Sequence, residues 1–263
     1  MRKIAFYSTF ILITGIFTLY GCKKDLENIS NPQKFSFRES SRFEAILDSI
    51  GVIHNQALSF SLDKIKAQNL FADLDSSQAI ELVPSLANEY LNNYFSPIPF
   101  TYDSTFTDSI WYSILFSSQD PTHNYSLTYQ EKITEFLSAY DTSTSPDSFK
   151  DYALFFLETT IDSIPVEEQT IFKAAILITF NSFEYWNDNL QSWLNEYTDQ
   201  NNLTPVALRL FDVKKCGKAD LIGAIKGGIK AAENGGGIKD IVTGAVWGAV
   251  SASLFSSYQA LRQ

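Results

Sequence analysis

Residues 218–233, KADLIGAIKGGIKAAE, and residues 238–261, IKDIVTGAVWGAVSASLFSSYQAL, decide the fold of this chain. In the first segment the apolar residues recur at helical spacing, with lysines available to the opposite face. The second segment carries no charge over the 21 residues 241–261. Between them stands Asn234-Gly235-Gly236-Gly237, and consecutive glycines stop a helix because they favour left-handed or extended backbone. The pattern predicts a tight helical hairpin.

Glycine is concentrated in this hairpin, where nine of the chain's twelve glycines lie within residues 214–263. A glycine inside a helix costs about 1 kcal/mol relative to alanine, so its repeated use there needs a physical reason. Gly223 and Gly227 are four residues apart, as are Gly244 and Gly248, and residues four apart share one helix face. A face of small residues lets another helix approach closely. We therefore expect these four glycines to mediate helix packing or membrane contact.

This spacing resembles the glycine-zipper helices of pore-forming and two-peptide bacteriocin-like polypeptides, over about forty residues. Two alternatives stay open. In one, the hairpin packs on the protein's own body or on itself. In the other, it enters a bilayer, since its uncharged run can span about 30 Å of hydrocarbon and the seven basic and three acidic residues of 214–263 suit an anionic lipid surface. A solvated helix face explains the same lysines.

The first 21 residues have the pattern of a secretory signal peptide, with Arg2 and Lys3 before an apolar run. Leu19-Tyr20-Gly21-Cys22 follows and resembles the lipobox of bacterial lipoproteins. The resemblance implies that Cys22 becomes an acylated N-terminus that binds a membrane, and several acyl chains anchor a protein stably. An uncleaved signal anchor is the alternative. Residues 22–38 have no sustained periodicity and are predicted to form a tether.

The charged triplet Lys23-Lys24-Asp25 resembles the signal that sends some Bacteroidota lipoproteins to the outer face of the outer membrane. Together with the lipobox, it implies a lipoprotein of a Gram-negative cell envelope, anchored to the outer membrane. The resemblance leaves open which leaflet the protein occupies and whether it is exposed at the cell surface.

Residues 39–213 are predicted to form an α-helical domain, so that the whole protein is all-α, a multi-helix bundle with a C-terminal hairpin rich in glycine and alanine. Apolar residues recur at steps of three and four in five segments. These segments are 43–58, 76–94, 128–140, 147–162 and 166–197. The aromatic-rich stretch 95–124 follows no single period, and Ile110–Phe116 within it fits either a helix or a strand.

Charge excludes one class of partner. The chain has a net charge of −10, and residues 22–213 carry −16. Nucleic-acid binding requires clustered lysine and arginine, so an acidic body of this kind excludes it. A protein partner is compatible with the sequence, which leaves its identity and the oligomeric state open. With Cys22 acylated, no intramolecular disulfide is expected, because the chain has only one further cysteine.

Motifs that carry chemistry are missing from the sequence: it has no H-E-x-x-H, C-x-x-C, G-x-S-x-G, phosphate loop or dinucleotide fingerprint. We therefore expect no catalytic residue, metal or cofactor, and the first hypothesis is a structural or interaction lipoprotein. A membrane-active, toxin-like lipoprotein that acts through its glycine-zipper hairpin is the alternative. A carboxylate-based hydrolase is the second alternative, with Glu167-Glu168 and Asp73-x-Asp75 as acid/base or calcium-ligand candidates.

His54 is one of only two histidines, with His123, and it lies in the stretch Gly51-Val52-Ile53-His54-Asn55-Gln56-Ala57-Leu58. This stretch resembles a G-x-x-H-N-x-x-L pattern near the start of uncharacterised secreted and lipoprotein families of bacteria. We expect His54 to be a buried, hydrogen-bonded residue that braces two helices. The alternative is a ligand or catalytic pair formed with Asn55.

Overall fold

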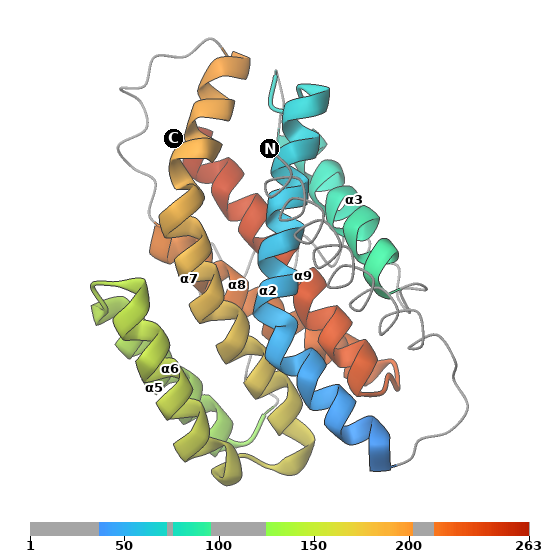
Figure 1. Ribbon diagram of the computed structural model, residues 1–263, viewed down its shortest axis with the longest axis vertical. Helices are drawn as coiled ribbons and strands as arrows, with labels where there is room; N and C mark the ends of the chain where they lie inside the picture. The colour runs from blue at the N-terminus through green and yellow to red at the C-terminus, as the bar shows by residue number, and fades with distance from the viewer. Residues whose placement is uncertain (1–36, 73–75, 96–124, 202–212, 263) are drawn as a thin grey trace, which may run out of the picture. The chain divides into compact units, whose positions relative to one another are not determined.

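The computed structural model describes residues 37–72, 76–95, 125–201 and 213–262 (Figure 1). These residues contain seven α-helices, one short 3-10 turn and no β-strand, so the all-α prediction is confirmed. The helices are α2 Phe37–Gln68, α3 Ser76–Phe95, α5 Leu127–Thr142, α6 Pro146–Thr160, α7 Val166–Asn201, α8 Val213–Glu233 and α9 Ile238–Arg262. The ambiguous stretch Ile110–Phe116 lies outside the described residues, as do His123 and Cys22.

Contacts divide the chain into two compact units, Met1–Ser40 and Ser41–Gln263. The second unit contains both the helical body and the C-terminal hairpin. Its core is formed by the apolar faces that the sequence pattern predicts; for example, Ile50 of α2, Leu91 of α3 and Phe136 of α5 are fully buried. Hydrophobic burial therefore joins the hairpin and the body in one folding unit.

The turn between α8 and α9 is built by its glycines. Gly235 has a φ of 73°, which favours glycine over any residue with a side chain. The backbone N–H of Gly235 donates to Ala232 O and that of Gly236 to Ala231 O, at 2.9 and 3.1 Å, which is the Schellman ending of a helix. The Asp240 carboxylate then accepts from the N–H of Gly237 at 3.0 Å and caps the start of α9. These bonds end one helix and begin the next within four residues.

Close contact between α8 and α9 explains the spacing of the four glycines. A Cβ atom added at Gly223 would collide with the backbone carbonyl of Gly248, and one added at Gly248 would collide with that of Gly223. One turn further along, a Cβ at Gly227 would collide with the carbonyl of Gly244. The two backbones thus touch without side chains between them, at a separation that only glycine permits.

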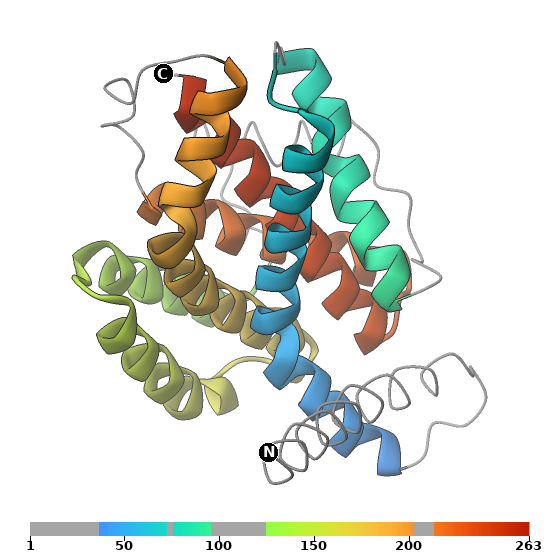
Figure 2. The same cartoon turned by 45° about the horizontal axis from the view of Figure 1, so that its top comes forward.

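Helix α9 is the buried centre of this unit. It packs against α8, α3 and α7, and in both ribbon views the red α9 runs obliquely behind α2 (Figures 1 and 2). The side chains from Val242 to Tyr258 are buried, and Trp247 is fully enclosed. The part of the uncharged run from Val242 to Tyr258 therefore lies inside the protein, as expected if the hairpin packs on the body.

The antiparallel pair α5 and α6 covers α7, with α6 contacting α7 directly. Helix α5 begins one residue earlier than the predicted start at Thr128, because Ser126 is its N-cap and accepts a hydrogen bond from the N–H of Tyr129. The carboxylate that completes this cap comes from Glu168 of α7, which accepts from both the N–H and the hydroxyl of Ser126 at 2.8 and 2.7 Å. The cap therefore ties α5 to α7, a long-range contact that local spacing does not reveal.

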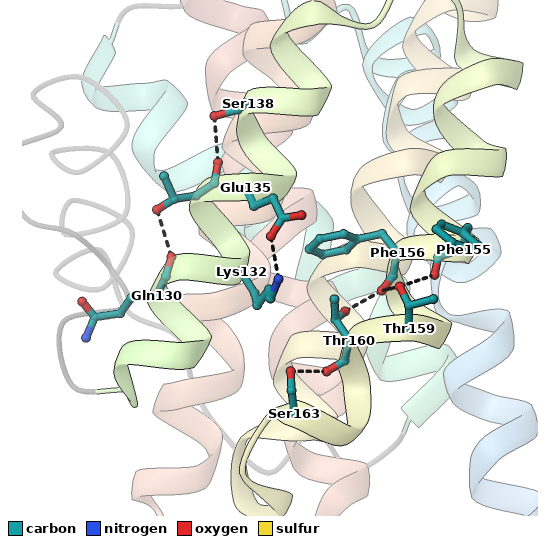
Figure 3. A network of polar contacts seen from close by, with 10 residues as sticks. Gln130, Lys132, Glu135, Ser138, Phe155, Phe156, Thr159, Thr160 and Ser163 are labelled. Carbon is teal, nitrogen blue, oxygen red and sulfur yellow. Dashed lines mark hydrogen bonds and ion pairs between the residues drawn. The ribbon is translucent and has the colours of Figure 1, made fainter.

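Serine and threonine hydroxyls on α5 and α6 are satisfied within their own helices (Figure 3). Ser138 donates to Thr134 O at 3.0 Å, and Thr159 donates to Phe155 O at 2.9 Å. Lys132 pairs with Glu135 three residues on, at 2.7 Å, in a partly exposed setting. Such local bonds stabilise single helices.

The glycine contact makes a quantitative prediction about α8. We expect Gly227→Ala to lower the free energy of unfolding by about 1–3 kcal/mol, because the new methyl group must push α8 away from the Gly244 carbonyl, and this outweighs the gain in helix propensity. Urea unfolding followed by circular dichroism measures the change.

The neighbouring Gly228→Ala is the matched control. Its Cβ would lie 3.1 Å from the side chain of Ile171, which can adjust, so a change below about 1 kcal/mol in either direction is expected. Equal effects of the two substitutions would show that backbone contact does not govern this helix pair.

Candidate functional site

A cluster of polar side chains lies at the junction of four helices in the core. His54 comes from α2, Ser182 and Trp186 from α7, Asp220 from α8 and Ser253 from α9, and all five are fully buried. Asp220 is the centre of the cluster. Its Oδ1 lies 3.3 Å from His54 Nε2, and its Oδ2 accepts hydrogen bonds from Ser182 Oγ and, at 3.0 Å, from Ser253 Oγ. Trp186 Nε1 donates to Ser253 Oγ at 2.8 Å.

Asn55 orients the imidazole ring of His54. The side-chain amide N–H of Asn55 donates to the backbone carbonyl of Asn181 at 2.9 Å, so the amide oxygen of Asn55 faces His54 Nδ1, 3.0 Å away. That oxygen only accepts, so Nδ1 must donate. His54 Nε2 and Asp220 Oδ1 lie 3.3 Å apart. The pair is within ion-pair distance, although these two atoms are outside hydrogen-bond geometry.

The stretch Gly51 to Leu58 now has a physical explanation. A Cβ at Gly51 would collide with the Asn181 side chain, so glycine lets α2 approach α7. One turn later, Asn55 bonds the Asn181 carbonyl, His54 reaches Asp220, and Leu58 is fully buried. The residues that define the G-x-x-H-N-x-x-L pattern therefore serve one helix junction, and His54 braces α2 against α8.

The cluster contains serine, histidine and aspartate, but not in the arrangement of a hydrolase. A serine nucleophile needs its hydroxyl on a histidine nitrogen that can take the proton. Here both Ser182 and Ser253 donate to Asp220, while the two nitrogens of His54 face Asn55 and Asp220. None of the five cluster residues reaches solvent. In this arrangement the cluster holds helices together and has no base available to a nucleophile.

The other sequence-predicted acidic candidates lie apart from this cluster. Glu168 caps α5 through Ser126, and Glu167 is exposed beside it on the first turn of α7. Asp73 and Asp75 lie outside the described residues. In the parts of the chain that the structure describes, no three side chains of His, Cys, Asp and Glu gather as a metal site.

Near the start of α7, burial changes the acid–base behaviour of two tyrosines. The rings of Tyr125 and Tyr129 stack with centroids 4.3 Å apart. Desolvation raises the pKa of both phenols, and the nearby Glu168 carboxylate raises it further in each case. On α8, burial alone lowers the pKa of Lys226. Both effects follow from desolvation of the charged form, and the two phenols remain neutral.

Sequence reasoning found His54 but missed its partners. Asp220 had a detectable signal, because it is the single acidic residue on the apolar face of its predicted helix and lies one turn before Gly223 and Ala224. A charge in that position is costly unless a partner meets it in the core. Ser182, Trp186 and Ser253 gave no such signal, since each fits an ordinary helix position.

Comparison with models of protein families, with curated proteins and with solved structures finds no match to this chain. The fold and the cluster are therefore interpreted from the residues of this chain alone.

A double-mutant cycle tests the pairing of His54 with Asp220. We expect His54→Leu and Asp220→Leu each to destabilise the protein, because each leaves a buried polar partner unpaired. The double substitution should cost less than the sum, with a coupling of about 0.5–3 kcal/mol measured by urea unfolding.

The partly exposed pair Lys132 and Glu135 provides a control cycle with alanine, for which a coupling of about 0.2–1 kcal/mol is expected. Strict additivity of the two leucine substitutions would mean that the two side chains do not interact in solution.

Proposed function

We propose that this protein is a lipid-anchored component of a Gram-negative cell envelope that works by binding another protein through the outer surface of its helical domain. The observation that supports this most directly is the closed interior. The uncharged part of α9 from Val242 to Tyr258 and the polar cluster around Asp220 are both buried. What remains for contact with partners is the acidic, helical exterior.

The anchor in this proposal is Cys22, which follows a lipobox-like tetrapeptide after an apolar leader. Acylation at Cys22 would hold the domain Ser41–Gln263 near a membrane by way of residues 23–38. Anchoring confines the domain to a surface and thereby raises its effective concentration for partners in the same envelope.

Lipid attachment can be tested in bacterial cells grown with an alkyne-labelled fatty acid. We expect the wild-type protein to take up the label and to fractionate with the membrane, whereas Cys22→Ser should lose both properties, because the thiol that accepts the lipid is gone. Gel fluorescence and membrane fractionation provide the measurements.

Cys216→Ser is the matched control, because it removes the chain's other cysteine, which is buried on α8, and should leave labelling intact. Label that persists in Cys22→Ser would rule out lipidation at this residue.

A second candidate function is supported by α9. Ile238–Tyr258 is the one described helix whose length and composition suffice to cross a membrane, with a mean hydropathy of 1.2, and 78% of its most apolar window is buried inside the protein. Both core helices and membrane spans pass this test. We propose as the alternative that the α8–α9 hairpin enters a bilayer and makes the protein membrane-active.

Trp247 reports on that alternative, because it is fully buried in α9 and its Nε1 donates to Asn88 Oδ1 at 2.7 Å. If the hairpin enters lipid, vesicles of brominated phosphatidylglycerol should quench Trp247 fluorescence and release an entrapped dye. Trp247→Phe should then remove most of the quenching while the other tryptophans remain. Quenching that is the same in the wild type and in Trp247→Phe would contradict insertion of α9.

A further inference from the structure

The hairpin of α8 and α9 is internally self-sufficient. Its two helices touch backbone to backbone through Gly223 with Gly248 and Gly227 with Gly244. The turn is closed by hydrogen bonds among its own residues, and one hydrogen bond, from Ser253 to Asp220, connects the two helices deep in the core. All of these contacts lie between residues 213 and 262, so separating the hairpin from the other helices would break none of them.

The polar contacts that join the hairpin to the remaining helices include the hydrogen bond from Trp247 to Asn88 of α3 and two further groups. At the centre of the hairpin, Asp220 lies within ion-pair distance of His54 of α2 and accepts a hydrogen bond from Ser182 of α7. Ser253 accepts a hydrogen bond from Trp186 of α7. At the surface, Lys218 pairs with Asp141 at the end of α5, at 2.7 Å. The central contacts are fully buried, whereas the pair at the surface is 40% and 47% exposed.

We infer that α8 and α9 undock from the domain as one unit, and that the buried polar cluster centred on Asp220 is the lock that holds this unit in place. The reason is that the contacts of this cluster are cooperative. One carboxylate accepts from two hydroxyls and lies within ion-pair distance of a histidine whose other nitrogen faces Asn55, so losing one partner leaves buried polar groups without compensation. Supersecondary motifs with strong internal contacts commonly open as single cooperative units.

The inference does not depend on lipid attachment, and it supplies the motion that membrane entry by the hairpin would require. A cysteine of the chain itself can report the undocking. Cys216 is fully buried on α8 one turn before Asp220, and Cys22 is the only other cysteine. In the full-length chain carrying Cys22→Ser, Cys216 is therefore the single thiol, and the rate of its reaction with iodoacetamide measures undocking.

The decisive variant is His54→Leu, which removes the partner on α2 and leaves every internal contact of the hairpin intact. We expect Cys216 in this variant to be labelled about tenfold faster than in the chain that carries Cys22→Ser alone, when each rate is divided by the rate of the same chain in urea. Ser182→Ala is a milder second variant and should increase the rate by a smaller factor. Lys218→Gln, which breaks the exposed pair with Asp141, is the matched control and should change the rate by less than about twofold.

Two relocated thiols, each in a chain that also carries Cys22→Ser and Cys216→Ser, test whether the hairpin moves as one unit. Ala249→Cys places the thiol on α9, and Ala153→Cys places it on α6, which packs on α5 and α7. With His54→Leu added, the α9 thiol should accelerate by the same factor as Cys216, and the α6 thiol should keep its rate. Acceleration at α6 as well, unequal factors at α8 and α9, or no acceleration at all would each overturn the inference.

Discussion

Backbone contact between α8 and α9 is the constraint on which the rest of this structure depends. Without side chains at Gly223, Gly227, Gly244 and Gly248, the two helices share one compact surface. The other faces of α9 are then free to bury their side chains against α3 and α7. A larger residue at these positions would move α9 relative to α7, and with it Ser253 relative to Trp186. The unfavourable helix propensity of these glycines is thus offset by packing against several other helices.

The buried cluster adds specificity to this apolar arrangement. Apolar contact is non-directional, so a helix as uniform as α9 could slide or rotate among similar packings. Asp220, with hydroxyl donors from α7 and α9 and with His54 of α2 at ion-pair distance, meets all three partners at one register only. Buried polar groups are weak sources of net stability, yet they can select one arrangement over its neighbours. We assign that role to this cluster.

Sequence periodicity predicted the helices well, because long amphipathic segments carry a strong local signal. The break at residues 234–237, the faces of α2 and α3, and the length of α7 follow from apolar spacing and glycine conformation. The partners of those faces did not follow, because helix pairing depends on contacts between residues far apart in the chain. His54 and Asp220 are separated by 166 positions, and Glu168 of α7 completes the N-terminal cap of α5. Single-sequence patterns contain no record of such contacts.

The burial of α9 also determines what could move it. Exposing Val246, Trp247, Val250, Leu254 and Phe255 to water would cost roughly 10 kcal/mol at about 2 kcal/mol for each side chain, so in aqueous solution the docked hairpin predominates and undocking is a rare opening. A bilayer changes this balance, because lipid tails are as apolar as a leucine core and the hydrophobic term largely cancels on transfer. The polar cluster then becomes the main difference between the two environments, because Asp220 has three partners in the protein, Ser182, Ser253 and His54, and hydrocarbon offers it none. The residues that fix the register of the core are therefore the same residues that would decide whether a membrane can take the hairpin.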